Sequence, residues 1–199
     1  MPLRVDNGVQ GSGGAYAPGN VGDVFATAGY CGRSFNEGLI RFHDSASAPA
    51  FREHVATAFP ELARTGADVL AFDWQGRQLV ATNNSGTDDT ELVVADIGRG
   101  EVSEFGSLSQ FTNILRHDDL TAQLFEEDLF TGWKQTVGGA GLGLPFTDCV
   151  TFTLPLYLGG TNEPTNLEQG DMDMAWTIGA ALWEQARDLP PGTPITFTT

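Results

Sequence analysis

Residues 149–194 read CVTFTLPLYLGGTNEPTNLEQGDMDMAWTIGAALWEQARDLPPGTP, and they set out a strand, a turn and a helix in that order. The first part alternates, with an apolar residue at every even position from Val150 to Leu158. A period of two predicts a β-strand. Because Pro155 cannot donate a hydrogen bond to a neighbouring strand, we expect this strand at a sheet edge or with a bulge. The glycine pair at 159–160 ends it.

The second part of this stretch predicts one long helix. Asp171 is placed to cap its start, and the Pro-Pro-Gly sequence at 190–192 ends it. Apolar residues at helical spacing form one stripe, which is the face expected to pack on the rest of the protein. The stripe consists of Met172, Trp176, Gly179, Trp183 and Ala186, widened by Ile178 and Leu182.

Two β-hairpins are predicted upstream of this stretch. Residues 67–73 and 77–82 flank one short glycine-containing turn, and residues 90–96 and 101–105 flank another. These four strands predict an antiparallel meander. A further strand of about five residues is predicted at 39–43.

Three more helical segments accompany the predicted strands. Ser47 fits an N-cap and Pro49 a first helical turn, and the apolar residues that follow share one helical face. Ser107 and Gln110 fit a capping box at the start of a second helix. A third helical piece is predicted over 119–133, although an acidic run within it interrupts the apolar pattern and indicates a solvated face.

The order of these elements predicts the fold class. Strands and helices are mixed and do not alternate in βαβ units, which favours an α+β fold with helices packed on an antiparallel sheet. Residues 1–20 are rich in Gly, Asn, Ser and Pro and are expected to form a flexible tail. The glycine-rich break at 138–143 suggests two parts, 21–134 and 135–199, either as separate domains or as one continuous body.

Charge is the strongest compositional signal. The formal net charge is −16, and residues 78–134 contribute −8 of it from 11 acidic and 3 basic residues. Such a field repels nucleic acid and anionic membranes and attracts a basic partner, although acidity can also serve solubility alone. No run of about 18 apolar residues predicts a membrane span, and no apolar signal segment begins the chain, so a cytoplasmic location is expected.

No catalytic constellation stands out in the sequence. His43, His54 and His117 are far apart and form no metal-binding motif. Cys31 and Cys149 lie in no nucleophile context and are expected to be reduced structural residues. The glycine run at 138–143 lacks the lysine and the following helix of a phosphate loop. We therefore expect no enzyme activity, no cofactor and no metal.

Several motifs together resemble a known family. FNEGLIRFH at 35–43 and FDWQGRQ at 72–78 are similar to the opening of GAD-like domains. LPLYLGG at 154–160, NLE at 166–168 and DMDMAW at 171–176 resemble the C-terminal domain of type VI secretion immunity proteins. Those proteins carry a GAD-like part followed by this C-terminal part and are related in character to the SUKH immunity superfamily. The resemblance implies a SUKH-like fold.

The resemblance also implies a function without catalysis. An immunity protein binds a cognate secreted toxin, most often a nuclease, and blocks its active site, so the expected partner is a basic toxin protein. The alternative is a scaffold or regulatory module of the same fold. The most acidic stretch is the candidate contact surface. It comprises Asp88, Asp89, Glu91, Glu101, Glu104, Asp118, Asp119, Glu126, Glu127 and Asp128.

Overall fold

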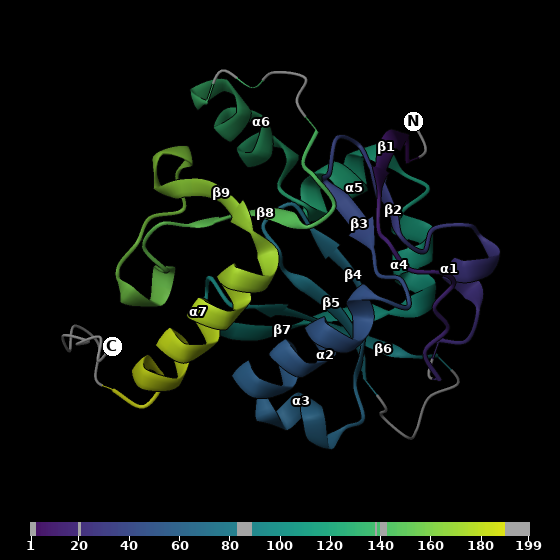
Figure 1. Ribbon diagram of the computed structural model, residues 1–199, viewed down its shortest axis with the longest axis horizontal. Coiled ribbons are helices and arrows are strands. Elements are labelled where there is room, and N and C mark those ends of the chain that lie inside the picture. Colours follow the sequence, from purple (N-terminus) through teal and green to yellow (C-terminus); the bar gives the residue numbers. More distant parts are fainter. Residues whose placement is uncertain (1–2, 20, 83–88, 138, 140–142, 190–199) are drawn as a thin grey trace.

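A seven-stranded antiparallel sheet runs through the middle of the protein (Figure 1). The computed structural model describes residues 3–19, 21–82, 89–137, 139 and 143–189. The strands lie side by side in chain order as β1 (Val5–Gln10), β2 (Arg33–Phe35), β3 (Ile40–Phe42), β4 (Asp68–Asp73), β5 (Gln78–Thr82), β6 (Glu91–Asp96) and β7 (Glu101–Ser107). Both predicted hairpins are confirmed, and they belong to a longer meander that β1–β3 extend toward the N-terminus.

Helices cover both faces of this sheet, which confirms the α+β fold class. One face carries α2 (Ser47–Ala58), α3 (Pro60–Arg64) and α7 (Met172–Ala186), and Figure 1 shows α2 and α7 in front of the strands. The other face carries α1 (Val24–Thr27), α4 (Leu108–Ile114), α5 (Asp118–Leu124) and α6 (Glu127–Thr136). Among the described residues, none of the helices combines the length and apolar character that crossing a bilayer requires.

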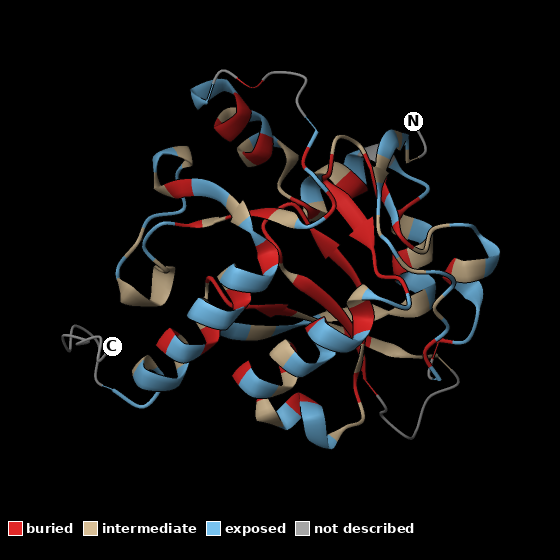
Figure 2. Ribbon diagram, viewed as in Figure 1, coloured by how far each residue is buried: buried red, intermediate tan, exposed pale blue. Residues whose placement is uncertain are grey.

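The sheet separates two hydrophobic cores. Side chains of a strand alternate between its faces, so Leu79 and Ala81 of β5 join the core that contains Phe111 of α4. Val80, between them, joins the core that contains Trp176 of α7. Figure 2 shows the result: the central strands are buried, whereas the outward helix faces are exposed and the edge strands β1 and β7 carry exposed residues. This double burial explains why the central strands are continuously apolar.

The C-terminal segment adds a two-stranded sheet of β8 (Asp148–Phe152) and β9 (Leu167–Asp171). The strand predicted over residues 150–158 is correct as far as Phe152 and wrong beyond it. Leu156–Leu158 forms a 3-10 turn, and the Leu156 amide donates to the carbonyl of Gly98 in the β6–β7 turn at 3.0 Å. The strand thus ends three residues before Pro155, which could not have continued the ladder because it has no N–H to donate.

Polar contacts join this segment to the β4–β5 turn. The Val150 amide donates to the Trp74 carbonyl at 2.8 Å, and the Trp176 indole N–H donates to the Gly76 carbonyl at 2.8 Å. Gly76 has a φ of +79°, and a Cβ built there would lie 3.2 Å from the Cys149 sulfur. The turn therefore requires glycine both for its backbone and for the close approach of β8.

Within the range 1–20, which was expected to form a flexible tail, residues 5–10 form a strand. Val5–Gln10 forms β1 and pairs with β2. A carboxylate of this strand fixes the connection that follows β2: Asp6 accepts from the Ser34 hydroxyl at 2.6 Å and from the Glu37 amide at 2.7 Å. Sequence patterning missed this strand because its pairing uses polar residues and has no apolar period.

The predicted starts of two helices are confirmed. Ser107 and Gln110 form the capping box of α4, and Asp171 accepts from the Met174 amide at the start of α7 at 2.9 Å. The prediction for α2 is wrong in one respect. Ser47 lies inside the helix, and Asp44 performs the capping, accepting from the Ser47 amide at 2.8 Å.

Two further expectations need correction. The helical piece predicted over 119–133 is two helices, because Glu126 adopts a left-handed conformation with a φ of +53° between α5 and α6. On α7, Trp176 and Leu182 are buried as predicted, but Ile178 is 52% exposed and lies outside the packed stripe. The helix therefore buries a narrower face than its sequence indicates.

Candidate partner-binding surface

Strand β7 ends the sheet opposite β1 and carries two of the predicted contact residues. Glu101 and Glu104 are exposed side chains on this strand. Among the strands that the structure describes, β7 pairs with β6 alone. The predicted acidic surface thus includes an uncovered strand edge.

A hollow of about 500 Å³ lies beside this edge. Its lining comes from four elements and the chain before β6, and it brings together three predicted contact residues, Asp89, Glu91 and Glu104. Apolar side chains complete the lining, among them Leu62 of α3 and Val93 of β6. The hollow therefore combines apolar and acidic residues in its lining.

Asp89 is held at the start of α4. Its Oδ1 accepts from the Ser109 amide at 3.4 Å. Hydrogen bonds from the Ser107 side chain and from Ser109 lower the pKa of Asp89 below its usual value. The carboxylate is therefore ionised at neutral pH, where it also suits the positive end of the helix dipole.

Glu126 behaves differently from the solvated face predicted for residues 126–128. Its side chain is only 30% exposed and forms ion pairs with Arg77 at 3.2 Å and with Arg99 at 3.3 Å. These arginines come from the β4–β5 and β6–β7 turns, so Glu126 ties both turns to the α5–α6 junction. Its negative charge is therefore paired with two arginines of the same chain.

Three of the remaining predicted contact residues lie on helices and not on β7. Asp119 is exposed on α5, whereas Glu127 and Asp128 occupy the first turn of α6, where Asp128 is exposed. Asp88 and the side chain of Asp118 lie outside what the structure describes. The structure thus brings three of the ten predicted residues, Asp89, Glu91 and Glu104, to one hollow, and Glu101 lies on the same strand as Glu104 at the other end of the β6–β7 ladder.

Buried ion pairs support the β4–β5 and β6–β7 turns, at the opposite end of these strands from the hollow, and sequence reasoning missed them. Asp73 pairs with Arg77 at 2.5 Å, and Asp96 pairs with Arg99 at 2.7 Å. Burial raises the pKa of Asp73, while its contacts with Arg77 oppose that rise. The sequence did hold a signal, since each pair joins the last residue of a strand to an arginine in the following turn.

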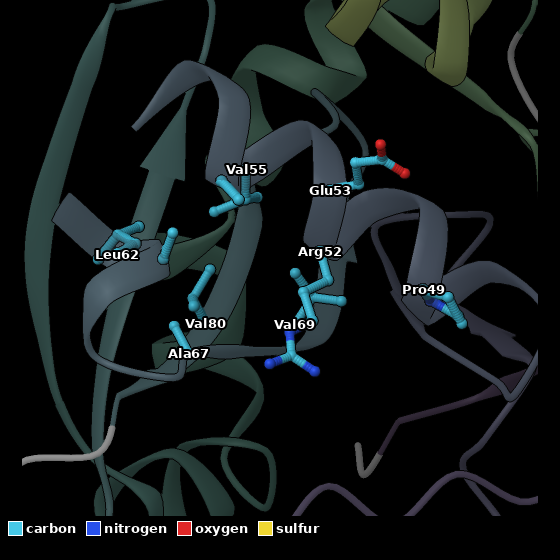
Figure 3. Close-up of a pocket in the computed structure, with 10 residues that line it drawn as sticks. Pro49, Arg52, Glu53, Val55, Leu62, Ala67, Val69 and Val80 are labelled. Carbon is cyan, nitrogen blue, oxygen red and sulfur yellow. The ribbon is translucent and has the colours of Figure 1, made fainter. Parts of the chain in front are cut away.

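A second hollow of about 340 Å³ lies between α2, α3 and strands β4 and β5 (Figure 3). Val55, Leu62 and Val80 contribute its apolar walls. Arg52 also lines it and pairs with Asp68 at 3.3 Å. Leu62 lines both hollows, so they adjoin across α3.

Two of the residues with catalytic potential, His43 and Cys149, are buried in the fold, whereas His54 and Cys31 are half-buried and His117 is exposed. His43 is buried between Ser47, 3.0 Å from Nδ1, and Gln78, 2.8 Å from Nε2, and burial lowers its pKa to about 4. Burial raises the pKa of Cys149 to about 12, which leaves a neutral thiol. Across the described residues, His, Cys, Asp and Glu form no group of three or more that could hold a metal ion.

Comparison with known proteins finds a similar fold and no related family. No protein-family model matches the chain, and no curated protein matches it. A solved structure, Atu4351 from Agrobacterium tumefaciens, is similar with a TM-score of 0.56 and 19% sequence identity. The match covers 74% of this chain and 68% of that one. At this identity the similarity supports the fold alone.

Proposed function

We propose that this protein is an immunity protein that binds a basic toxin, most often a nuclease in this class, and neutralises it stoichiometrically. The observation that carries the proposal is the acidic edge of the sheet, where Asp89, Glu91 and Glu104 line one hollow beside β7 and Glu101 lies on the same strand as Glu104. The motifs at 35–43 and 154–160, which resemble those of type VI secretion immunity proteins, point to the same function.

The physical argument concerns charge and shape. A nuclease is positive where it grips the phosphates of its substrate. An acidic protein can occupy that groove as a charge mimic, and the opposite fields speed the encounter. The apolar lining supplied by Leu62 and Val93 offers surface for burial, which gives such a complex a longer lifetime than charge alone.

The test begins with capture of partners from the producing cells, with the full chain as bait, followed by mass spectrometry. We expect one basic protein that dissociates as salt rises. Expressed alone in a recipient strain, it should stop growth, and co-expression of this chain should restore growth. A captured protein that is harmless when expressed alone would contradict the proposal and favour the scaffold function.

A further inference from the structure

The outer edge of β7 is a backbone surface available for pairing. Within the described part of the chain, β7 is bonded to β6 and to no other strand. An edge strand presents N–H and C=O groups that can pair with another chain. The end of the strand is closed, because the Ser107 amide donates to the Gln110 side chain at 2.8 Å. The open part is therefore Glu101–Phe105.

Most of this open part is regular. The ladder runs from Asp96 opposite Glu101 to Val93 opposite Glu104, and its register then shifts, so that Phe105 is the additional residue. Four consecutive residues thus keep strand geometry at the edge. A segment of similar length could pair with them without rearrangement of the sheet.

We propose that the partner adds an extended, basic segment to the outer edge of β7 as an eighth strand. This inference rests on the proposed function, since the toxin supplies the segment. The charged side chains of β7, Glu101 and Glu104, are both acidic and both exposed. Opposite charges on adjacent strands stabilise pairing and like charges oppose it, so a basic segment is favoured over a second copy of β7.

The hollow beside β7 adds a requirement on the segment. Glu104 lines this hollow together with Leu62 and Val93, so the edge and the apolar lining are continuous. Side chains of a strand alternate between its two faces. A segment with basic and apolar residues in alternation would therefore place apolar side chains toward the hollow while its backbone pairs with β7.

Hydrogen exchange on the full-length protein tests this pairing with a defined probe. The probe is a ten-residue peptide of alternating lysine and valine. The control has the same sequence with every backbone amide N-methylated, which keeps the charge and removes the hydrogen-bond donors from both edges of the peptide. We expect the first peptide to slow exchange of the amides at 101–105 and the control to leave them unchanged. Equal effects of both peptides, or protection confined to another surface, would overturn the inference.

Charge-reversed variants separate the edge from the general acidity of the chain. Glu101 and Glu104 lie three residues apart and so point to opposite faces of β7, and the lysines of the added strand lie on the face of Glu101. E101K/E104K should weaken binding of the first peptide by about tenfold, because the attraction between Glu101 and these lysines becomes repulsion and Glu104 no longer adds to the acidic field. The matched variant E163K/E168K changes two exposed glutamates outside β7 and has the same net charge, so it should bind like the parent. Equal weakening by the two variants would reduce the interaction to overall charge and refute the inference.

Exchange in the toxin complex distinguishes failure of this inference from failure of the proposed function. If a toxin is captured and neutralised while the amides at 101–105 exchange at their free rate, the function stands and strand addition is wrong. If the peptide protects β7 and no captured protein is toxic, strand addition stands and the immunity function is wrong.

Discussion

At the residue scale, a buried charged side chain connects segments that are far apart in the sequence. Arg41 of β3 is completely buried, and its guanidinium donates to the carbonyls of Pro145 at 2.8 Å, Asp73 at 3.0 Å and Asp148. Burial lowers its pKa to about 10, so it remains charged at neutral pH. One side chain thus connects the sheet to the segment that leads into β8.

Replacing this arginine should expose its structural role. Arg41→Met keeps much of the side-chain length but leaves several buried carbonyls without a donor, so we expect a loss of about 3 kcal/mol in the free energy of unfolding. Urea denaturation measures it. The control Arg52→Met removes an arginine that is 56% exposed and should change stability by less than about 1 kcal/mol. Equal losses in the two variants would contradict the assigned role.

His43 should make stability depend on pH. Its folded pKa of about 4 lies below the unfolded value of 6.5, so between these values the unfolded chain binds a proton that the folded protein does not. Stability therefore falls as the pH falls from 6.5 to 4, by on the order of 3 kcal/mol. We expect His43→Asn to remove this part of the slope in urea denaturation. If the exposed-site control His117→Asn removes as much of it, the assignment to His43 is wrong.

At the element scale, the elements that could be predicted from the sequence are those that short-range sequence patterns determine. The hairpins β4–β5 and β6–β7 and the caps at Ser107 and Asp171 follow from short-range chemistry. Strand β1 and the break at Glu126 do not, because β1 depends on pairing with a distant strand and Glu126 on ion pairs with two turns. Long-range contacts of this kind leave no periodic trace in the sequence.

The packing of α7 against the β6–β7 turn gives a prediction for an element. Gly100 has a φ of +66°, and a Cβ built there would lie 2.5 Å from the Trp183 ring. Gly100→Ala should therefore lower the free energy of unfolding by about 2 kcal/mol, through backbone strain and displacement of the ring. Gly170→Ala in β9 is the control, since its Cβ meets nothing within 4 Å and should cost far less. Urea denaturation of both variants measures the difference. Equal losses in the free energy of unfolding would show that this contact does not hold α7 in place.

At the scale of the whole molecule, the fold sorts the acidic residues into two groups. Glu126 and Asp96 are paired with arginines inside the protein, whereas Glu101 and Glu104 remain exposed on β7. The sequence alone predicts the acidic region as a partner surface but cannot make this division, because it does not show which charged side chains are buried. The negative charge that is exposed at the surface is therefore smaller than the net charge of −16 suggests.

The measurement that tests the central claim most directly is a titration of toxin activity with this protein. The captured toxin is held at a fixed concentration well above its dissociation constant, and its activity is followed as the protein is added. The account predicts a linear fall that reaches zero at one protein per toxin and activity that returns when the complex is separated in high salt. Progressive loss at far smaller ratios would show that the protein acts as a catalyst, and undiminished activity at excess protein would show that it does not neutralise the toxin; either result would contradict the account.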